Sequence, residues 1–473
     1  MSEPARLILP SLRWRPDGGF AHEAAAIADA LHLGVGGFII FGGTVEAVRR
    51  LTADLLRRAG RPLLIACDLE RGAGQQVTGL TEFPPPAALA SLEDATVVRW
   101  AGAVTAQEAR AVGINWVLAP VADLDVLPAN PIVQTRAFGE DPQRVASYVR
   151  SWIEGCQDAG ALACAKHYPG HGRTTVDSHI DLPVVDASAA LLRGSDLVPF
   201  HVAVEAGVAS IMTGHVAYPS LDPSGLPATL SKPVLDELRG TLGFHGLVVS
   251  DALVMDGALQ GRRESDAAVE ALNAGVDLLL YPNDARRIKE ALEQALESGA
   301  LSRGRLVEAL ARYERALAVA SGPTAPVARG PFDSSDALAD ALLDQGMIRG
   351  AAPRLEGPVD LLVVDDDLGG AYPPGPSDWT SLALGDEIVG RYAGGSRVVL
   401  AFAEPRAWKG RPGFGVSSLE TLADRAAGAD LVVLYGHPRL LSQIPGDAPV
   451  LLAWHRQRLM QEAVARWLRK RLT

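Results

Sequence analysis

Cysteine is scarce in this chain of 473 residues, which has only Cys67, Cys156 and Cys164. An odd number this small does not build a disulfide framework. Positive charge is also in short supply, because 44 Lys and Arg residues face 56 Asp and Glu residues and leave a net charge of −12. Nucleic acid and anionic membranes are therefore not expected as partners, since both bind through clustered Lys and Arg.

Long apolar runs and targeting signals are lacking too. No run approaches the roughly 18 residues of a membrane span. The N-terminus has no basic region ahead of its short apolar run, unlike a secretory signal peptide. Neither a P-loop nor a G-x-G-x-x-G after a strand occurs, so no organic cofactor is expected. We expect a cytoplasmic protein in a reducing compartment, and the sequence indicates no oligomeric state.

What is present is the composition of a globular protein, with 48% hydrophobic and 21% charged residues. The length favours about three domains, or two if one is a large α/β barrel. Eight short runs are apolar on successive residues, as in parallel strands that are covered on both faces. These runs are 6–9, 37–41, 63–67, 116–119, 162–166, 209–213, 247–250 and 277–281.

Segments of helical spacing separate these runs, at 22–33, 47–58, 97–112, 144–159 and 233–239. The alternation predicts a (β/α)8 barrel over 1–320, with a doubly wound open sheet as the alternative. Residues 321–331 follow a long helical stretch at 285–320 and are rich in Pro, Gly and Ala, which predicts a linker. Further buried runs and a closing helix then predict a smaller α/β sandwich domain over 332–473. They are 361–364, 397–402, 431–435, 450–453 and the helix at 456–472.

Ionisable residues stand near the carboxyl ends of several predicted strands, where the loops of a parallel barrel form the active-site face. Each of them alone has an ordinary explanation, as a helix cap or a hydrogen-bonded buried side chain. Their joint placement predicts an active site on the face formed by the carboxyl ends of the strands. They are Asp68, Asp123, Lys166, His167, His215 and Asp251.

The densest polar stretch is 166–183, KHYPGHGRTTVDSHIDLP, in which His167, His171 and His179 fall within 13 residues. Its Pro and Gly residues predict a loop over the end of the fifth strand. Three imidazoles can ligate zinc. The neighbouring Lys166 disfavours a cation, however, and no ligand pair has helical spacing, so we expect no metal.

Two further interpretations of this loop involve Asp177, Ser178 and His179. We do not expect a Ser–His–Asp triad, because the side chains of adjacent residues in an extended loop project to opposite sides and cannot contact one another. Asp177 and His179, two residues apart in an extended chain, would instead share a face. The carboxylate would then hold the imidazole in one tautomer, which suits general acid/base chemistry near neutral pH.

Asp251 directly follows the predicted strand at 247–250. A carboxylate at the tip of a buried strand is rigidly aimed, as a covalent nucleophile must be. The alternative is that Asp251 caps a helix at 252–259, and Asp is a good residue for that position. The residues alone leave both interpretations open.

Two motifs together resemble those of glycoside hydrolase family 3. They are HYPGHG…DSH…LP, which follows Lys166 of the fifth predicted strand, and VVSDALVMDGA at the seventh. More narrowly they resemble its β-N-acetylhexosaminidase branch, which removes terminal β-linked N-acetylglucosamine. The resemblance covers about residues 5–320. The C-terminal part, including LLAWHRQRLMQEAVARWL, is similar to the α/β sandwich domain of two-domain members, with looser motifs.

The resemblance implies a retaining glycosidase that uses a covalent glycosyl-enzyme. It implies Asp251 as the nucleophile, His179 as the acid/base and Asp177 as the partner of His179. It also implies a small carbohydrate substrate, and for a cytoplasmic enzyme the natural class would be muropeptide fragments in peptidoglycan recycling. The residues implied to bind the sugar are Asp68, Arg136, Lys166 and His167.

One loop departs from the family pattern. The family continues the strand-three Asp as DQEGGRV-x-R, whereas this chain has DLERGAGQQ, with Arg71 displaced and Gln76 in place of the second Arg. In the family that Arg normally contacts sugar hydroxyls, so the sequence leaves the identity of the sugar open. Arg173 also replaces an acidic residue common after GHG, which we interpret as a change at the loop surface.

Three alternatives to hydrolysis of N-acetylglucosaminides remain. A His acid/base is never anionic and would not repel phosphate, so the same residues could support phosphorolysis. A β-glucosidase of the same family is the second alternative, although such enzymes take their acid/base from the C-terminal domain and lack the GHG…DSH loop. A non-catalytic sugar-binding barrel is the third.

Overall fold

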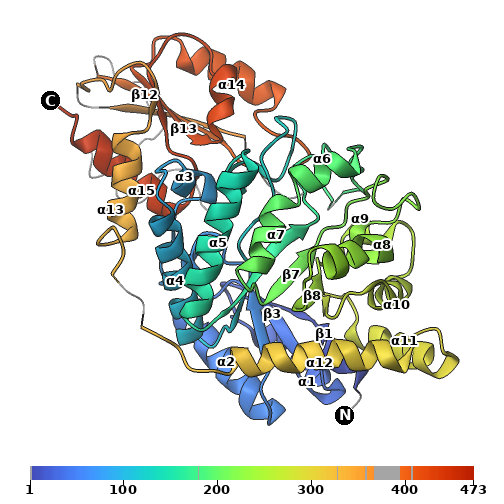
Figure 1. Cartoon of the computed structure of the whole chain (residues 1–473). Helices are drawn as coiled ribbons and strands as arrows, with labels where there is room; N and C mark the ends of the chain where they lie inside the picture. The colour runs from blue at the N-terminus through green and yellow to red at the C-terminus, as the bar shows by residue number, and fades with distance from the viewer. Residues whose placement is uncertain (1–2, 179, 327–328, 357–358, 367–394, 406–408) are drawn as a thin grey trace. The chain divides into compact units, whose positions relative to one another are not determined.

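The computed structural model describes the chain except residues 1–2, 179, 327–328, 357–358, 367–394 and 406–408 (Figure 1). The described chain forms two compact units, which we treat separately. Unit 1 comprises Met1–Glu82, Asp94–Leu127 and Ala137–Arg329. Unit 2 comprises Phe83–Glu93, Pro128–Arg136 and Gly330–Thr473. Two short excursions from the first half of the sequence therefore belong to unit 2.

Unit 1 is built on parallel strands that close into a barrel. Seven of them form one sheet in sequence order: β2 (Ser11–Arg13), β3 (Gly37–Phe41), β4 (Leu64–Cys67), β5 (Trp116–Val117), β6 (Leu162–Tyr168), β7 (Ser210–Thr213) and β8 (Leu247–Ser250). Pro10 separates β2 from β1 (Ile8–Leu9), which pairs with β9 (Leu279–Leu280). A bridge between Val249 and Leu278 joins β8 to β9 and closes the ring. The structure therefore confirms the predicted (β/α)8 barrel and not the alternative, a doubly wound open sheet.

Helices surround these strands (Figure 1). They are α1 (Ala24–Leu33), α2 (Val45–Ala59), α4 (Ala95–Ala111), α5 (Pro142–Asp158), α6 (Ala189–Gly194), α7 (Val198–Glu205), α8 (Lys232–Asp236), α9 (Asp256–Leu259), α10 (Glu264–Ala274), α11 (Ala285–Ser298) and α12 (Arg303–Ala320). The helical stretch predicted at 285–320 is confirmed, but it consists of two helices, α11 and α12. Gly299 adopts a φ of +77° and ends α11, and Ser302 then caps α12 through its side chain.

One buried ion cluster ties α12 to the amino end of β9. Asp277 is fully buried and accepts from the backbone N–H of Val248 and from three guanidinium groups. Its carboxylate oxygens lie 2.6 Å from Arg239 Nη2, 2.7 Å from Arg305 Nη2 and 3.1 Å from Arg312 Nη1. A buried carboxylate is tolerated only when paired in this way.

Unit 2 is the predicted smaller α/β sandwich, and its strand order is β10-β14-β13-β12-β11. The strands are β10 (Met347–Arg349), β11 (Asp360–Asp365), β12 (Arg397–Ala403), β13 (Leu431–Gly436) and β14 (Val450–Leu452). The antiparallel edge strand β10 was not predicted. The helices with the later strands are α13 (Ser335–Asp344), α14 (Val416–Ala426) and α15 (Arg458–Arg469), and α3 (Pro86–Ala90) lies in the first excursion.

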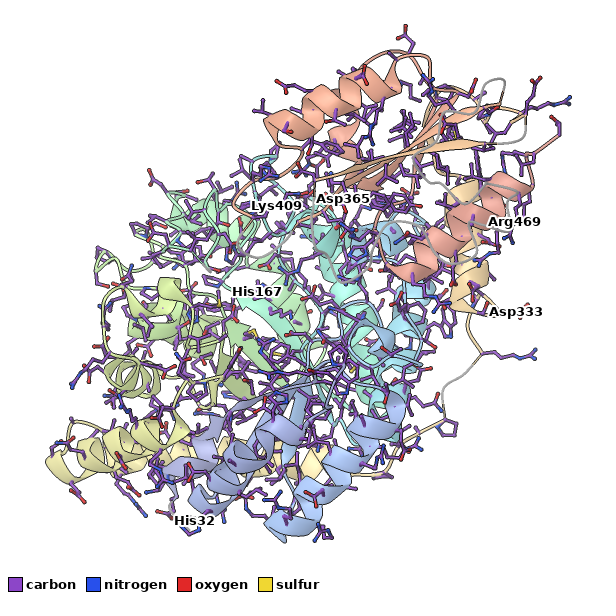
Figure 2. The ribbon with its side chains drawn as sticks, turned by 180° about the vertical axis from the view of Figure 1, so that it is seen from behind. His32, His167, Asp333, Asp365, Lys409 and Arg469 are labelled. Carbon is purple, nitrogen blue, oxygen red and sulfur yellow. The ribbon has the colours of Figure 1, made fainter. Side chains whose placement is uncertain are left out.

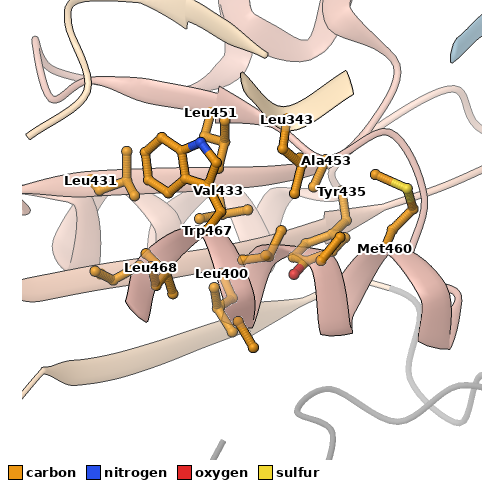
Figure 3. Packing of buried hydrophobic residues seen from close by; sticks show 14 of the residues in the cluster. Leu343, Leu400, Leu431, Val433, Tyr435, Leu451, Ala453, Met460, Trp467 and Leu468 are labelled. Atoms are coloured by element: carbon orange, nitrogen blue, oxygen red, sulfur yellow. The ribbon is translucent and has the colours of Figure 1, made fainter. Parts of the chain in front are cut away.

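The core of unit 2 lies between α15 and its sheet. Trp467 and Leu468 of α15 pack against Leu431 and Val433 of β13 and against Leu451 of β14 (Figure 3). Hydrogen bonds attach both excursions to this unit. Gln457 Nε2 donates to the carbonyl of Phe83, and Gln134 Nε2 donates to the carbonyl of Pro412. Across the described ranges, no helix combines the length and the apolar character that crossing a bilayer requires.

Candidate active site

The carboxyl ends of the barrel strands bring the predicted ionisable residues to one edge of unit 1. Asp68 follows β4, Lys166 and His167 lie in β6, and Asp251 follows β8. Figure 2 labels His167 among these strands. Because all the strands are parallel, these side chains share the face on which barrel enzymes carry their chemistry.

Lys166 is a buried cation held by two carboxylates. Its side chain is 3% exposed, and its Nζ lies 2.7 Å from Asp68 Oδ1 and 2.8 Å from Glu70 Oε1. Asp68 is partly exposed, whereas Glu70 is buried. The structure therefore brings together Lys166 and Asp68, as expected, and adds Glu70. The only sequence signal for Glu70 was its position two residues after Asp68.

His167 is oriented by Asp123, which is fully buried. Asp123 Oδ2 lies 2.7 Å from His167 Nδ1, and Oδ1 accepts from the backbone N–H groups of His167 and His171. Burial alone would raise the pKa of Asp123, but its interactions with His167 and His171, above all those with the His167 ring, outweigh burial and lower that pKa. An ionised carboxylate only accepts hydrogen bonds, so His167 Nδ1 carries a proton and donates it to Asp123.

His171 is also buried, and its ring joins two hydroxyl groups. Nδ1 lies 2.6 Å from Thr174 Oγ1, and Nε2 lies 3.1 Å from Ser178 Oγ. The Thr174 hydroxyl donates to the carbonyl of His171, so Nδ1 carries the proton and Nε2 accepts from Ser178. Burial lowers the pKa of His171 to about 4 and keeps the ring neutral at pH 7.

The described residues 177, 178, 180 and 181 do not form the extended chain that the sequence predicts. Ile180 N and Asp181 N both donate to the carbonyl of Asp177. Asp177 and Ser178 are buried. His179, the predicted acid/base, lies outside the described residues.

Ser178 is held from two sides. Its hydroxyl contacts His171, and its carbonyl accepts from the backbone N–H of Gly257 at 3.2 Å. A Cβ atom at Gly257 would lie 2.8 Å from the Ser178 oxygen, closer than real Cβ contacts. Glycine is therefore needed at this position for the two segments to touch.

Arg173, near the start of the loop 166–183, is held by an ion pair. Its Nε lies 2.9 Å and 3.0 Å from the two carboxylate oxygens of the buried Asp196, and its Nη2 donates to Ser195 Oγ. This pair anchors the start of the loop to the turn between α6 and α7. The expected change at the loop surface is thus a structural anchor.

Asp251 is partly exposed and is fixed by neighbouring strands. Its N–H donates to the carbonyl of Thr213 at the end of β7, and its Oδ1 accepts from Ala252 N at 2.7 Å. The buried His215 donates from Nε2 to the carbonyl of Ala252 at 3.0 Å. The next helix begins only at Asp256, so Asp251 does not cap it. His215 thus braces the peptide bond between Ala252 and Leu253, one bond beyond the one that follows Asp251.

Two further residues named in the sequence analysis, Arg136 and Gln76, have backbone partners of their own. Arg136 is in unit 2, where its Nη1 donates to the carbonyl of Ile132. Gln76, which stands where the family has Arg, accepts from the backbone N–H of Gly42 at the end of β3. Within the described part of the chain, no three His, Cys, Asp or Glu side chains are grouped to hold a metal ion.

Comparisons with known proteins identify the family of the barrel. The model of the glycosyl hydrolase family 3 N-terminal domain matches residues 8–316. A beta-hexosaminidase from Thiobacillus denitrificans is 38% identical over 269 residues, which are 54% of this chain and 74% of the relative. A beta-N-acetylglucosaminidase/beta-glucosidase from Cellulomonas fimi is 34% identical over 290 residues, which are 59% of this chain and 51% of the relative.

A solved structure agrees over the whole chain. It is a glycoside hydrolase family 3 beta-N-acetylglucosaminidase from Paenibacillus sp. str. FPU-7, with a TM-score of 0.80 and 26% identity. The match covers 100% of this chain and 96% of that one. Because the family model spans more than half of the sequence, the chain belongs to glycoside hydrolase family 3 and is an enzyme that cleaves glycosidic bonds of a carbohydrate substrate.

Proposed function

We propose that this glycoside hydrolase is a retaining exo-β-N-acetylglucosaminidase with Asp251 as its nucleophile. The observation that carries the proposal is the gathering of Asp251 with the Lys166–Asp68 pair and His167 at one edge of the barrel. The relatives named beta-hexosaminidase and the solved structure of a beta-N-acetylglucosaminidase support the choice of sugar. The relative named beta-N-acetylglucosaminidase/beta-glucosidase is compatible with it.

In the first step, a carboxylate oxygen of Asp251 attacks the anomeric carbon and the glycosidic C–O bond breaks. His179 gives its proton to the leaving oxygen, and a covalent glycosyl-enzyme forms. The rigid attachment of Asp251 to β7 and to Ala252 supports this role, because a nucleophile must be held in place before the reaction.

In the second step, His179 accepts a proton from water as the water oxygen attacks the anomeric carbon. The ester bond to Asp251 breaks, and the sugar leaves with its configuration retained. Asp177 would orient His179 and stabilise its protonated form. The burial of Asp177 and the double attachment of Ser178 support a fixed starting point for this dyad.

The sugar would be held by polar groups on β4 and β6. Lys166, oriented by Asp68 and Glu70, and His167, oriented by Asp123, have the fixed geometry that binding of hydroxyl groups requires. Arg136 keeps the sugar-binding role that the resemblance implies. Muropeptide fragments with a terminal N-acetylglucosamine are the natural substrates that we propose.

A panel of para-nitrophenyl β-glycosides tests this proposal. We expect the N-acetylglucosaminide to give the highest kcat/KM among it, the glucoside, the xyloside and the N-acetylgalactosaminide. Proton NMR should show the β-anomer of the product first. A preference for the glucoside would instead support a β-glucosidase, and phosphate-dependent release of a sugar 1-phosphate would support a phosphorylase.

Two variants test the roles of the residues. Asp251→Asn should lose at least about 1,000-fold in kcat, because the amide is a poor nucleophile. His179→Ala should lose most on substrates with poor leaving groups and least on activated aryl glycosides, since only the former need a proton. Full turnover by Asp251→Asn would overturn the assignment of the nucleophile.

A further inference from the structure

An arginine on an aromatic support stands at the carboxyl edge of the barrel, on strands that carry none of the sugar-binding residues above. Arg13 ends β2, and its guanidinium carbon lies 4.3 Å from the centre of the Phe41 ring and 5.2 Å from that of Tyr281. Its Nε and Nη2 donate to the hydroxyl of Tyr281 at 3.0 and 2.7 Å. We call Arg13, Phe41 and Tyr281 the Arg13 cluster.

The position of Tyr281 is unusual in its backbone. Tyr281 directly follows β9 and has a φ of +50°, in the left-handed region that a bulky residue rarely adopts. Such strain persists only where the surroundings enforce it, and it gathers at functional sites. Here it accompanies the contact between the tyrosine hydroxyl and Arg13.

Hydrogen bonds connect this cluster to the segment of the proposed nucleophile. Leu280, the neighbour of Tyr281, donates from its N–H to Ser250 Oγ, and its carbonyl accepts from Leu253 N. Ser250 and Leu253 flank Asp251 on both sides. The cluster therefore stands on the strands next to Asp251, on the arc of the barrel formed by β9, β2 and β3.

The charge of Arg13 is not neutralised by its neighbours. Its side chain is exposed, and it makes no ion pair with any carboxylate among the residues that the structure describes. The carboxylate of Glu23 accepts from the backbone N–H of Arg13, not from its guanidinium. A tyrosine hydroxyl that only accepts hydrogen bonds orients the guanidinium without cancelling its charge.

We propose that the Arg13 cluster is a subsite for an anionic group, a carboxylate, on the leaving group of the substrate. The proposal rests on the proposed glycosidase function, because that function places the sugar over β4 and β6 and leaves the arc of β9, β2 and β3 to the leaving group. Guanidinium is the side chain best suited to carboxylates, and the two rings restrict its rotamers before the ligand arrives. The remaining guanidinium N–H groups supply the donors.

A matched pair of substrates tests the proposal. The para-carboxyphenyl and para-carbamoylphenyl N-acetyl-β-glucosaminides have the same shape and differ in charge. The readout is the ratio of their kcat/KM values in each variant relative to wild type, which cancels the difference in leaving-group reactivity. We expect Arg13→Gln to lower the preference for the carboxylate by about 3- to 10-fold, as befits an exposed charge.

Arg15→Gln is the matched control, because Arg15 is exposed and lies two residues further along the same segment. It should leave the ratio unchanged, and Arg13→Lys should restore part of it. Tyr281→Phe, which removes the hydroxyl and keeps the ring, should lower the ratio less than Arg13→Gln. In the wild type, about 0.5 M NaCl should reduce the preference, since an exposed charge is screened.

The outcomes separate the subsite from the enzyme function. Turnover of both substrates with a ratio that Arg13→Gln does not change would overturn the subsite and leave the glycosidase intact. Absence of turnover would instead contradict the proposed function. Acceleration by about 10 mM inorganic phosphate that depends on Arg13, without a carboxylate preference, would assign the anion to a phosphate nucleophile and overturn the proposal.

Discussion

His171 Nε2 accepts a hydrogen bond from the Ser178 hydroxyl across 3.1 Å, and this contact joins the rigid start of the loop to the segment that carries Asp177. The start of the loop is rigid because Asp123 holds the backbone of His171 and Asp196 holds Arg173. Ser178 lies between the two residues of the proposed dyad. We therefore propose that the neutral imidazole positions this segment, whereas His179 is the acid/base.

Ser178→Ala tests this contact. The variant loses a buried hydrogen bond, worth about 1 kcal/mol, and leaves His171 Nε2 without that donor. We expect faster hydrogen exchange of the amides at 175–181 and a kcat about 5- to 10-fold lower on alkyl glycosides, with a smaller loss on para-nitrophenyl glycosides.

Ser188→Ala is the control for this experiment, because Ser188 lies ten residues further along the chain and its hydroxyl caps α6 by accepting from Leu191 N. It should leave both readouts unchanged. Equal losses on alkyl and aryl glycosides in Ser178→Ala would contradict the positioning role, because a loop that only positions the proton donor matters most where a proton is needed.

Gly257→Ala should displace the same segment from the other side. The added Cβ would meet the Ser178 carbonyl oxygen at 2.8 Å, and that backbone atom cannot move aside without moving Asp177. We expect the same dependence on the leaving group as for Ser178→Ala, with a loss of stability of about 1–3 kcal/mol from the overpacking. Thermal unfolding and the two classes of glycoside are the measurements.

Gly304→Ala provides the matched comparison for that substitution. Gly304 lies in α12, and a Cβ there would have only Ser302 Oγ nearby, at 3.9 Å. This variant should be neutral or more stable, by up to about 1 kcal/mol, because Ala favours the helix. A Gly257→Ala protein as active and as stable as wild type would contradict the close contact at Ser178.

The sequence predicted the barrel well because burial on both faces leaves a strong local signal. Runs such as 162–166 and 247–250 are apolar on successive residues, and each became a strand at that position. The segment 285–320 was predicted as a single helical stretch because its apolar spacing continues across a short interruption. Gly299 ends α11 within it because a left-handed residue closes a helix, whatever pattern follows.

The candidate site was harder to predict, because partners are set by contacts between distant residues. Nothing local marks Glu70 as the second carboxylate on Lys166, 96 positions away in the sequence. Nor does any local pattern assign Phe83–Glu93 to unit 2, since the hydrogen bond that attaches it comes from Gln457. The extended geometry assumed for Asp177 failed because a turn of the backbone cannot be derived from side-chain spacing.

The pH dependence of stability offers a test of the neutral His171. Burial lowers its pKa to about 4, whereas an unfolded histidine titrates near 6.5. Between these values the unfolded chain binds a proton that the folded chain does not, so this residue makes stability fall as the pH drops from about 6.5 to 4. His171→Asn should therefore show a smaller decrease in Tm between pH 7 and pH 4.5 than wild type does.

His32→Asn is the control, since His32 is an exposed residue of α1 far from this loop in sequence (Figure 2). Its Tm should follow the wild-type pH dependence. Because His171→Asn also removes a packing group, the comparison uses the change of Tm with pH and not its absolute value. A wild-type slope in His171→Asn would mean that the imidazole is protonated in the folded state.

The ion cluster around Asp277 yields the largest stability effect that we predict. Asp277→Asn keeps the shape of the side chain but removes the one negative charge shared by Arg239, Arg305 and Arg312. Burial already lowers the pKa of Arg239 to about 10. Without Asp277 the three guanidinium groups would repel one another in a poorly solvated place, and their remaining carboxylate, Glu308, lies only 3.9 Å from Arg305 and 4.0 Å from Arg312. We expect urea titration to show a loss of about 3–5 kcal/mol in the free energy of unfolding, with catalysis by the remaining folded protein unchanged.

Asp54→Asn is the control, because it breaks exposed ion pairs with Arg57 and Arg58 on α2. It should lower the free energy of unfolding by less than about 1 kcal/mol in the same titration. Equal costs for the two variants would contradict the role of Asp277 as the anchor of α12, because the difference between them isolates burial from charge pairing.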